Sequence, residues 1–179
     1  MPAITVSEFL SYIRAFNNQD YSYQHSFYAP RVILALPETN EKQFASGPLQ
    51  GSHAIQLHYT PLHRVFNEAV VPLEILRNER HVVMIKRTVF QAKDVVPSFC
   101  GFAFEKGDVM VLHAWILYNF DEQRRMTMIQ LNMEKTEFLG AEKGFKERVE
   151  ECMERAEEKW DFLDEDNFWK MCTLDVETH

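Results

Sequence analysis

Three strand-length segments between His81 and Phe138 carry apolar residues on both of their faces, with polar groups set among them. They are HVVMIKRTVFQA, VMVLHAWILYNF and MTMIQLNMEKTEF. A strand with one face in water alternates apolar and polar residues, whereas a strand covered on both faces is apolar nearly throughout. The pattern therefore predicts a sheet that is covered on both faces.

Polar side chains interrupt these apolar segments at a few positions. They include Lys86, Arg87, His113, Tyr118, Asn119, Gln130, Asn132 and Glu134. A buried polar group costs about 1–3 kcal/mol unless it is paired. Several such groups on adjacent strands therefore indicate a lined cavity rather than a solid core.

Size and charge restrict the class of protein. A chain of 179 residues with 46% apolar content fits one domain with a full core. A formal net charge of −8 disfavours a nucleic-acid partner, because phosphate backbones bind basic surfaces. The three cysteines, Cys100, Cys152 and Cys172, are odd in number and far apart, which favours reduced thiols of an intracellular protein.

Targeting segments are not apparent in the sequence. The N-terminal MPAITVSEFL lacks the basic and apolar regions of a signal peptide. No apolar stretch approaches the ~20 residues that a membrane span requires. We therefore expect a cytoplasmic protein with no membrane partner.

The N-terminal part predicts helices and a strand. Thr5-Val6-Ser7-Glu8 has the pattern of a capping box, and an apolar stripe from Phe9 to Phe16 follows at helical spacing. A second short helix is expected over 21–28, ended by Pro30, and a strand over 31–37.

The middle of the chain predicts one more helix and a strand. Ser52 is positioned to cap the helix, which Pro61 should either kink or interrupt. A strand is then expected over 70–77.

After Gly140 the sequence becomes acidic and amphipathic. An apolar stripe that begins at Phe145 and Val149 continues to Leu163, with glutamates at most of the intervening positions. We expect a domain over 1–139 and a helical C-terminal extension over 140–179. Either the helix over 141–163 or a second subunit should cover the outer side of the sheet, and we expect a homodimer.

The order helix, helix, strand, helix and then four long strands resembles the cone-shaped α+β domain of the NTF2-like superfamily. The segments FNNQDY, FYAPRVILALP, GSHAIQLHY and KGDVMVLHAWILYNFDEQRRMTMIQL resemble its SnoaL-like branch of small polyketide cyclases and isomerases, over roughly residues 5–138. The resemblance implies a curved, mostly antiparallel sheet whose helices enclose one pocket. It also implies catalysis without a metal or cofactor on a polycyclic or polyketide-like secondary metabolite, by isomerisation, cyclisation or dehydration.

The layout is also similar to that of scytalone dehydratase. In that enzyme a Tyr–Asp pair ends the first helix and a histidine follows the third. Phe16-Asn17 and Phe66 stand at the corresponding places here. The catalytic residues of the dehydratase are therefore not carried over.

Four residues are candidates for acid–base catalysis: Arg87, His113, Glu134 and His58. A cofactor-free enzyme needs a group that titrates near neutrality and donors for a developing oxyanion. Arg87 lies among apolar residues and needs a partner, either Glu134 or a substrate enolate, unless it pairs at a dimer surface. A lone histidine such as His113 is more often structural.

Six residues are candidates for substrate binding: Tyr28, Arg31, Tyr59, Tyr118, Gln130 and Asn132. Buried tyrosines either donate from their hydroxyls or only pack. Gln130, Asn132 and Glu134 share one face of a strand. They would orient a substrate if that face is concave and belong to an interface if it is convex.

The sequence indicates no metal site. His53, His58 and His63 are five residues apart, which scatters them around a helix. The predicted partner is a small-molecule substrate. The alternative function is a non-catalytic binding or protein-association module, a role that this fold also performs.

Overall fold

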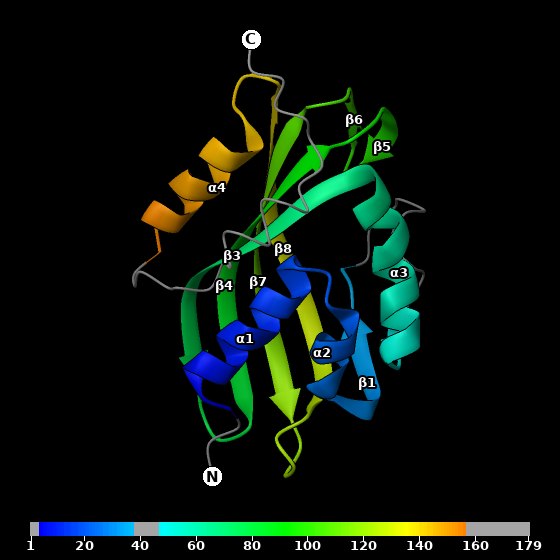
Figure 1. Ribbon diagram of the computed structural model, residues 1–179. Coiled ribbons are helices and arrows are strands. Elements are labelled where there is room, and N and C mark those ends of the chain that lie inside the picture. The colour runs from blue at the N-terminus through cyan, green and yellow to red at the C-terminus, as the bar shows by residue number, and fades with distance from the viewer. Residues whose placement is uncertain (1–3, 38–46, 157–179) are drawn as a thin grey trace.

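A large curved sheet with helices on both faces makes up the protein (Figure 1). The structure is a computed structural model and describes residues 4–37 and 47–156. Its helices are α1 (Val6–Asn17), α2 (Tyr21–Ser26), α3 (Ser52–Val65) and α4 (Phe145–Glu154). Its strands are β1 (Tyr28–Ala35), β2 (Leu49–Gln50), β3 (Phe66–Arg77), β4 (His81–Ala92), β5 (Val96–Phe99), β6 (Phe102–Phe104), β7 (Val109–Phe120) and β8 (Met126–Gly140).

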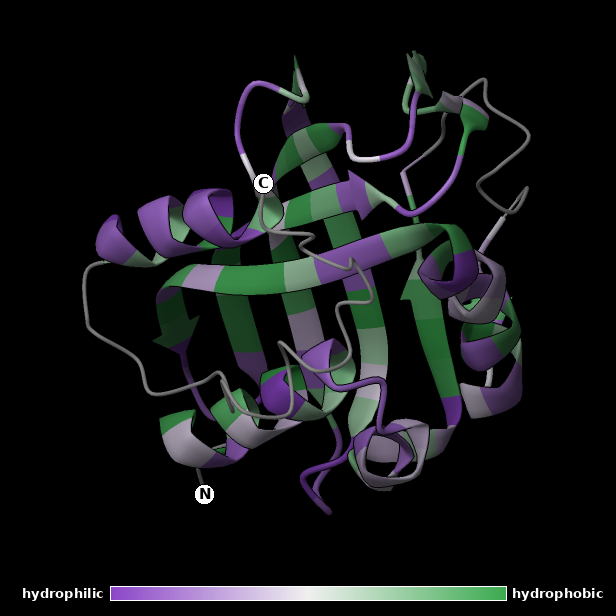
Figure 2. Ribbon diagram, turned by 45° about the horizontal axis from the view of Figure 1, so that its top comes forward, coloured by the Kyte–Doolittle hydropathy of each residue, from purple (hydrophilic) through white to green (hydrophobic). Residues whose placement is uncertain are grey.

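The main sheet has the strand order β2-β1-β8-β7-β4-β3, and β5 and β6 form a separate hairpin. β1 runs parallel to β8, whereas the other neighbours in the main sheet are antiparallel. The predicted α+β class, with a curved and mostly antiparallel sheet, is confirmed. Figure 2 shows green, apolar stretches along the long central strands of the sheet, interrupted by purple, polar positions.

The two faces of the sheet have different coverings. The inner face lies against α1–α3, where Phe9 and Ile13 share a core with Met84 and Tyr118. The outer face carries α4, whose apolar side chains pack on β3, β4 and β7. That second core contains Ala69, Val71, Val89, Val109, Val111, Phe145, Val149 and Cys152. Coverage on both faces explains why these strands lack the alternation of half-exposed strands.

Helix α4 is shorter than the helix predicted over 141–163. It begins at Phe145 and ends at Glu154, and residues 157–163 lie outside the described part of the chain. Its outward side is charged: Lys143 pairs with Glu151, and Arg148 pairs with the same carboxylate. The predicted amphipathic helix is confirmed where the structure describes it.

The N-terminal capping box is present, with Thr5 Oγ1 accepting from Glu8 N at 3.1 Å. The second helix ends at Ser26 rather than at residue 28, because Tyr28 already pairs with Met126 in the sheet. Helix α3 has Gly51 at its N-cap with a φ of 85°, so the prediction of a Ser52 cap is wrong.

Helix α3 continues through Pro61, so of the two outcomes expected there the interruption is wrong. Two further features differ from the sequence predictions. Strand β3 begins at Phe66 instead of Val70, and the β5–β6 hairpin was not predicted. Within residues 4–37 and 47–156, no helix is long and apolar enough to cross a membrane.

Candidate functional site

A small cavity, here called the inner pocket, lies between the inner face of the sheet and helices α1–α3. Its polar lining consists of Tyr12, Gln24, Tyr28, Tyr59, Lys86 and Tyr118. Its apolar lining consists of Ile13, Phe16, Leu34, Ile55, Val70, Ile116, Ile129 and Leu131. The centre of a water molecule can reach about 30 Å³ of it, which is room for solvent or a small polar group.

Four tyrosines surround this cavity. The hydroxyls of Tyr12 and Tyr28 lie 3.3 Å apart, and the Tyr12 ring meets that of Tyr118 edge-on at 6.0 Å. Burial raises the pKa of Tyr28, Tyr59 and Tyr118 well above the usual value, and it also raises the pKa of Tyr12. The four hydroxyls therefore stay neutral and are able to donate hydrogen bonds to a ligand oxygen.

Lys86 is the one charged residue among the described side chains that line the inner pocket. It is 7% exposed, and its Nζ donates to Thr88 Oγ1 at 2.8 Å. Burial lowers the pKa of Lys86 to about 8, although the negative charge of Glu68 opposes that change. A group with such a pKa is able to gain and lose a proton near neutral pH.

A buried polar network lies beside the pocket. Tyr21 Oη is 2.8 Å from His63 Nδ1, and His63 Nε2 is 3.0 Å from Glu68 Oε2. Glu68 and His63 are 8% and 6% exposed. Glu68 also acts electrostatically on Lys86 and Tyr59. The network therefore joins helices α2 and α3 to the wall of the inner pocket.

A larger apolar groove lies between the C-terminal half of α3 and the β5 strand. Its lining comprises His58, Pro61, Leu62, Val65, Phe66, Val96, Ser98 and Phe99, and its accessible space is about 360 Å³. His58 therefore lies in this groove and does not line the inner pocket. Burial lowers the pKa of His58.

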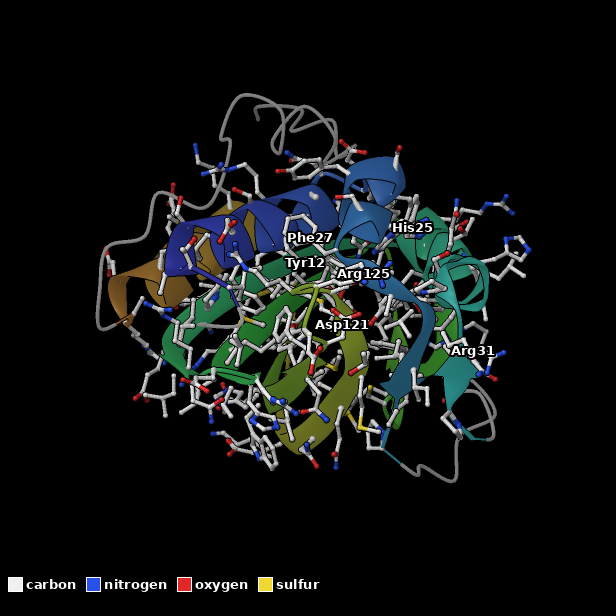
Figure 3. All side chains as sticks on the ribbon, turned by 90° about the horizontal axis from the view of Figure 1, so that it is seen from below. Tyr12, His25, Phe27, Arg31, Asp121 and Arg125 are labelled. Carbon is white, nitrogen blue, oxygen red and sulfur yellow. The ribbon has the colours of Figure 1, made fainter. Side chains whose placement is uncertain are left out.

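Of the predicted substrate-binding residues, Tyr28, Tyr59 and Tyr118 line the inner pocket. Their roles remain predictions. Arg31 is exposed on β1, and Figure 3 shows it at the side of the molecule. In the same view Asp121 and Arg125, which pair at 3.3 Å, lie near Tyr12 and Phe27 at the lower end of the sheet.

Three of the predicted catalytic residues, Arg87, His113 and Glu134, do not line the inner pocket. Arg87 lies opposite His113 in the β4–β7 register, on the face that carries α4. His113 Nε2 is 3.2 Å from Glu137 Oε1, not from Glu134, which is exposed at a register irregularity of β8.

Alternation along strand β8 places Gln130 and Asn132 on the outer face. Their β8 neighbours Ile129 and Leu131 line the inner pocket, and successive residues of a strand point to opposite faces. The two amides therefore lie on the outer face of the sheet, and the interface role expected for them on that face stays a prediction.

Sequence reasoning missed Lys86, Tyr12 and the Tyr21–His63–Glu68 network. Lys86 shares its side of β4 with Met84 and Phe90, which belong to the inner core. Alternation alone shows that these residues share a face, but it does not show which face holds the pocket. His63 and Glu68 meet because α3 ends one residue before β3 begins.

Comparisons with known proteins support the fold. No family model matches the sequence, and no curated protein matches it. Solved structures do match: an NTF2-like protein from Burkholderia pseudomallei is 13% identical with a TM-score of 0.57, covering 83% of this chain and 93% of that one. A candidate polyketide cyclase from Pseudomonas putida is 14% identical with a TM-score of 0.57, covering 75% and 92%.

A third similar structure is a Mycobacterium tuberculosis protein in complex with estradiol-17beta-hemisuccinate. It is 14% identical with a TM-score of 0.56, and the match covers 72% of this chain and 93% of that chain. The protein thus has the NTF2-like fold, and its structural neighbours include candidate polyketide cyclases and a protein bound to a steroid derivative. Among the described residues, no group of three or more side chains is arranged to hold a metal ion.

Proposed function

We propose that this protein is a cofactor-independent enzyme that isomerises, cyclises or dehydrates a polycyclic or polyketide-like metabolite by acid–base catalysis. The observation that carries the proposal is Lys86, a buried amine with a pKa near 8 inside a pocket of neutral tyrosines. Strongly perturbed groups in a cavity are typical of active sites.

The chemistry follows from the two kinds of polar group in the pocket. The neutral Lys86 amine accepts a proton from a carbon next to a carbonyl, and the resulting ammonium returns it at another position. Tyrosine hydroxyls such as those of Tyr12 and Tyr28 donate hydrogen bonds to the enolate oxygen that develops. Exclusion of water strengthens both interactions.

The structural neighbours support a ligand of this class. One is a candidate polyketide cyclase and another is in complex with a steroid derivative. The inner pocket accepts a carbonyl group as it stands, and a fused ring system requires side chains to move aside.

The test is exchange of carbon-bound hydrogen with deuterated water, followed by NMR on a small aromatic 1,3-diketone. We expect exchange by the native chain and at least a tenfold loss in Lys86→Met. Arg87→Met is the matched comparison, because Arg87 is the next residue on β4 but lies on the opposite face. Equal losses in the two variants would contradict the assignment of Lys86.

The second candidate function is ligand binding without turnover, which the apolar lining of the groove favours. It predicts that the diketone binds with no exchange above the buffer rate. We also propose that the protein forms a homodimer, because Trp115 and Leu117 on the outer face are only partly buried. Light scattering after size exclusion measures this directly.

A further inference from the structure

We propose that the Lys86 amine forms a covalent imine with the carbonyl carbon of an aldehyde or ketone that enters the inner pocket. The inference deepens the proposed function, since it requires that a carbonyl compound reach this pocket. It goes beyond proton transfer because it assigns a nucleophile and a covalent intermediate to the site.

The surroundings of Lys86 favour a nucleophilic amine. Nζ has a neutral hydroxyl as its hydrogen-bond partner, Thr88 Oγ1 at 2.8 Å. Within the described ranges 4–37 and 47–156, no ion pair joins Lys86 to a carboxylate. Glu68, the acid that acts on it electrostatically, is hydrogen-bonded to His63 at 3.0 Å.

Because no carboxylate pairs with the ammonium form, burial favours the uncharged amine. The uncharged amine is the form that has a lone pair for attack on carbon. A desolvated lysine in an apolar pocket is a recognised way to activate this nucleophile. The lowered pKa of Lys86, about 8, agrees with the geometry.

The reaction balances without an oxidant or a cofactor. The Nζ lone pair attacks the carbonyl carbon and forms the C–N bond, while the C=O π electrons move to oxygen, which takes up a proton. Nitrogen then loses a proton, which gives a neutral carbinolamine. Its hydroxyl is protonated and leaves as water while the nitrogen lone pair forms the C=N bond, and loss of the last N–H proton yields the imine.

The neighbouring tyrosines fit the proton transfers of these steps. Tyr12, Tyr28, Tyr59 and Tyr118 line the same cavity, and their hydroxyls remain protonated because burial raises the pKa of each. A neutral hydroxyl is able to donate to the carbonyl oxygen during attack and to the departing water. The favoured substrate class is therefore a small or flat aldehyde or ketone.

The experiment is reductive trapping of the full chain with acetaldehyde and cyanoborohydride, read by intact mass and peptide mapping. At pH 8 we expect Lys86 to be modified at least tenfold faster than the exposed Lys106. The pH midpoint of trapping at Lys86 should lie near 8. Equal rates at the two sites, or a midpoint near 10.5 at Lys86, would overturn the inference.

Variants provide the controls. Lys86→Met should remove the fast adduct and Lys106→Met should leave it unchanged; persistence of the fast adduct in Lys86→Met overturns the proposal. If Lys86→Met does not fold, the mapped rates and pH midpoints of the native chain decide the question. An adduct at Lys86 without hydrogen exchange supports the imine proposal and contradicts the proposed enzymatic function. Hydrogen exchange without an adduct at Lys86 overturns the imine proposal and leaves the proposed enzymatic function standing.

Discussion

Asn17 should contribute strongly to stability, because it is the hydrogen-bonding partner of an edge strand. Strand β3 ends the main sheet, so one side of its backbone has no neighbouring strand. Asn17 Nδ2 donates to Val70 O at 3.0 Å, and its Oδ1 accepts from Val70 N at 2.8 Å. Both residues are buried, at 3% and 4% exposure.

The magnitude follows from these two hydrogen bonds. In Asn17→Ala the Val70 amide and carbonyl lose their partner while remaining buried. An orphaned buried polar group costs about 1–3 kcal/mol, so the two together cost about 2–6 kcal/mol of the free energy of unfolding. That is a large part of the 5–15 kcal/mol that is typical of a whole domain.

Urea unfolding followed by circular dichroism measures the effect. The matched control is Asn18→Ala, because Asn18 is adjacent and its Oδ1 has no hydrogen-bond partner within residues 4–37 and 47–156, so this change removes no hydrogen bond to that oxygen and should cost less than Asn17→Ala. The reasoning fails if the two variants unfold at the same urea concentration. Val70 also lines the inner pocket, so Asn17→Ala should weaken ligand binding as well.

Three further predictions concern pH and packing. Lys86→Met should raise the free energy of unfolding at pH 7 by up to roughly 3 kcal/mol, because the native pKa of Lys86, about 8, lies below the 10.5 of an exposed lysine. The free-energy cost of charging the buried amine grows as the pH falls from 10.5 to 8. A titration of stability against pH should therefore show that the gain in the variant disappears above pH 10.5. His113→Gln should flatten the curve of stability against pH below about pH 6.5. Burial, and then the charge of Arg87, lowers the native pKa of His113, so the contribution of His113 to stability is complete above pH 6.5 and is lost as the pH falls through the native pKa. An unchanged curve below pH 6.5 in the variant would contradict this. Val149→Ala in α4 should cost roughly 1–3 kcal/mol in thermal or urea unfolding, since this side chain is fully buried against the outer face; no loss would mean that α4 does not stabilise the sheet.

The helices and long strands were predictable because their signals are local and repeated, whereas the curved sheet with its enclosed pocket followed from the resemblance to the NTF2-like domain. The capping box at Thr5, the apolar stripe of α1 and the doubly apolar strands each follow from spacing within a few residues. Helix α4 was predictable for the same reason. The β5–β6 hairpin was missed because its strands are only four and three residues long, too short for a periodic pattern.

The site was only partly predictable, since it depends on contacts between distant segments. Tyr28, Tyr59 and Tyr118 were selected as polar residues within apolar elements, and the fold brings all three to the inner pocket. The His63–Glu68 pair depends on how α3 turns into β3, and the Asn17 contact spans 53 residues along the chain. Neither has a signature in residue spacing.

The choice between Lys86 and Arg87 shows where sequence reasoning reaches its limit. The two residues are adjacent on β4, so a strand must point one of them into the pocket and the other away from it. Arginine was the better candidate from the sequence, because a buried guanidinium requires a partner. The fold instead places Arg87 near Cys152 under α4 and Lys86 among the tyrosines. A shift of one residue in register would exchange them, so the packing of α1 on the inner face and α4 on the outer face determines which cation is available for chemistry.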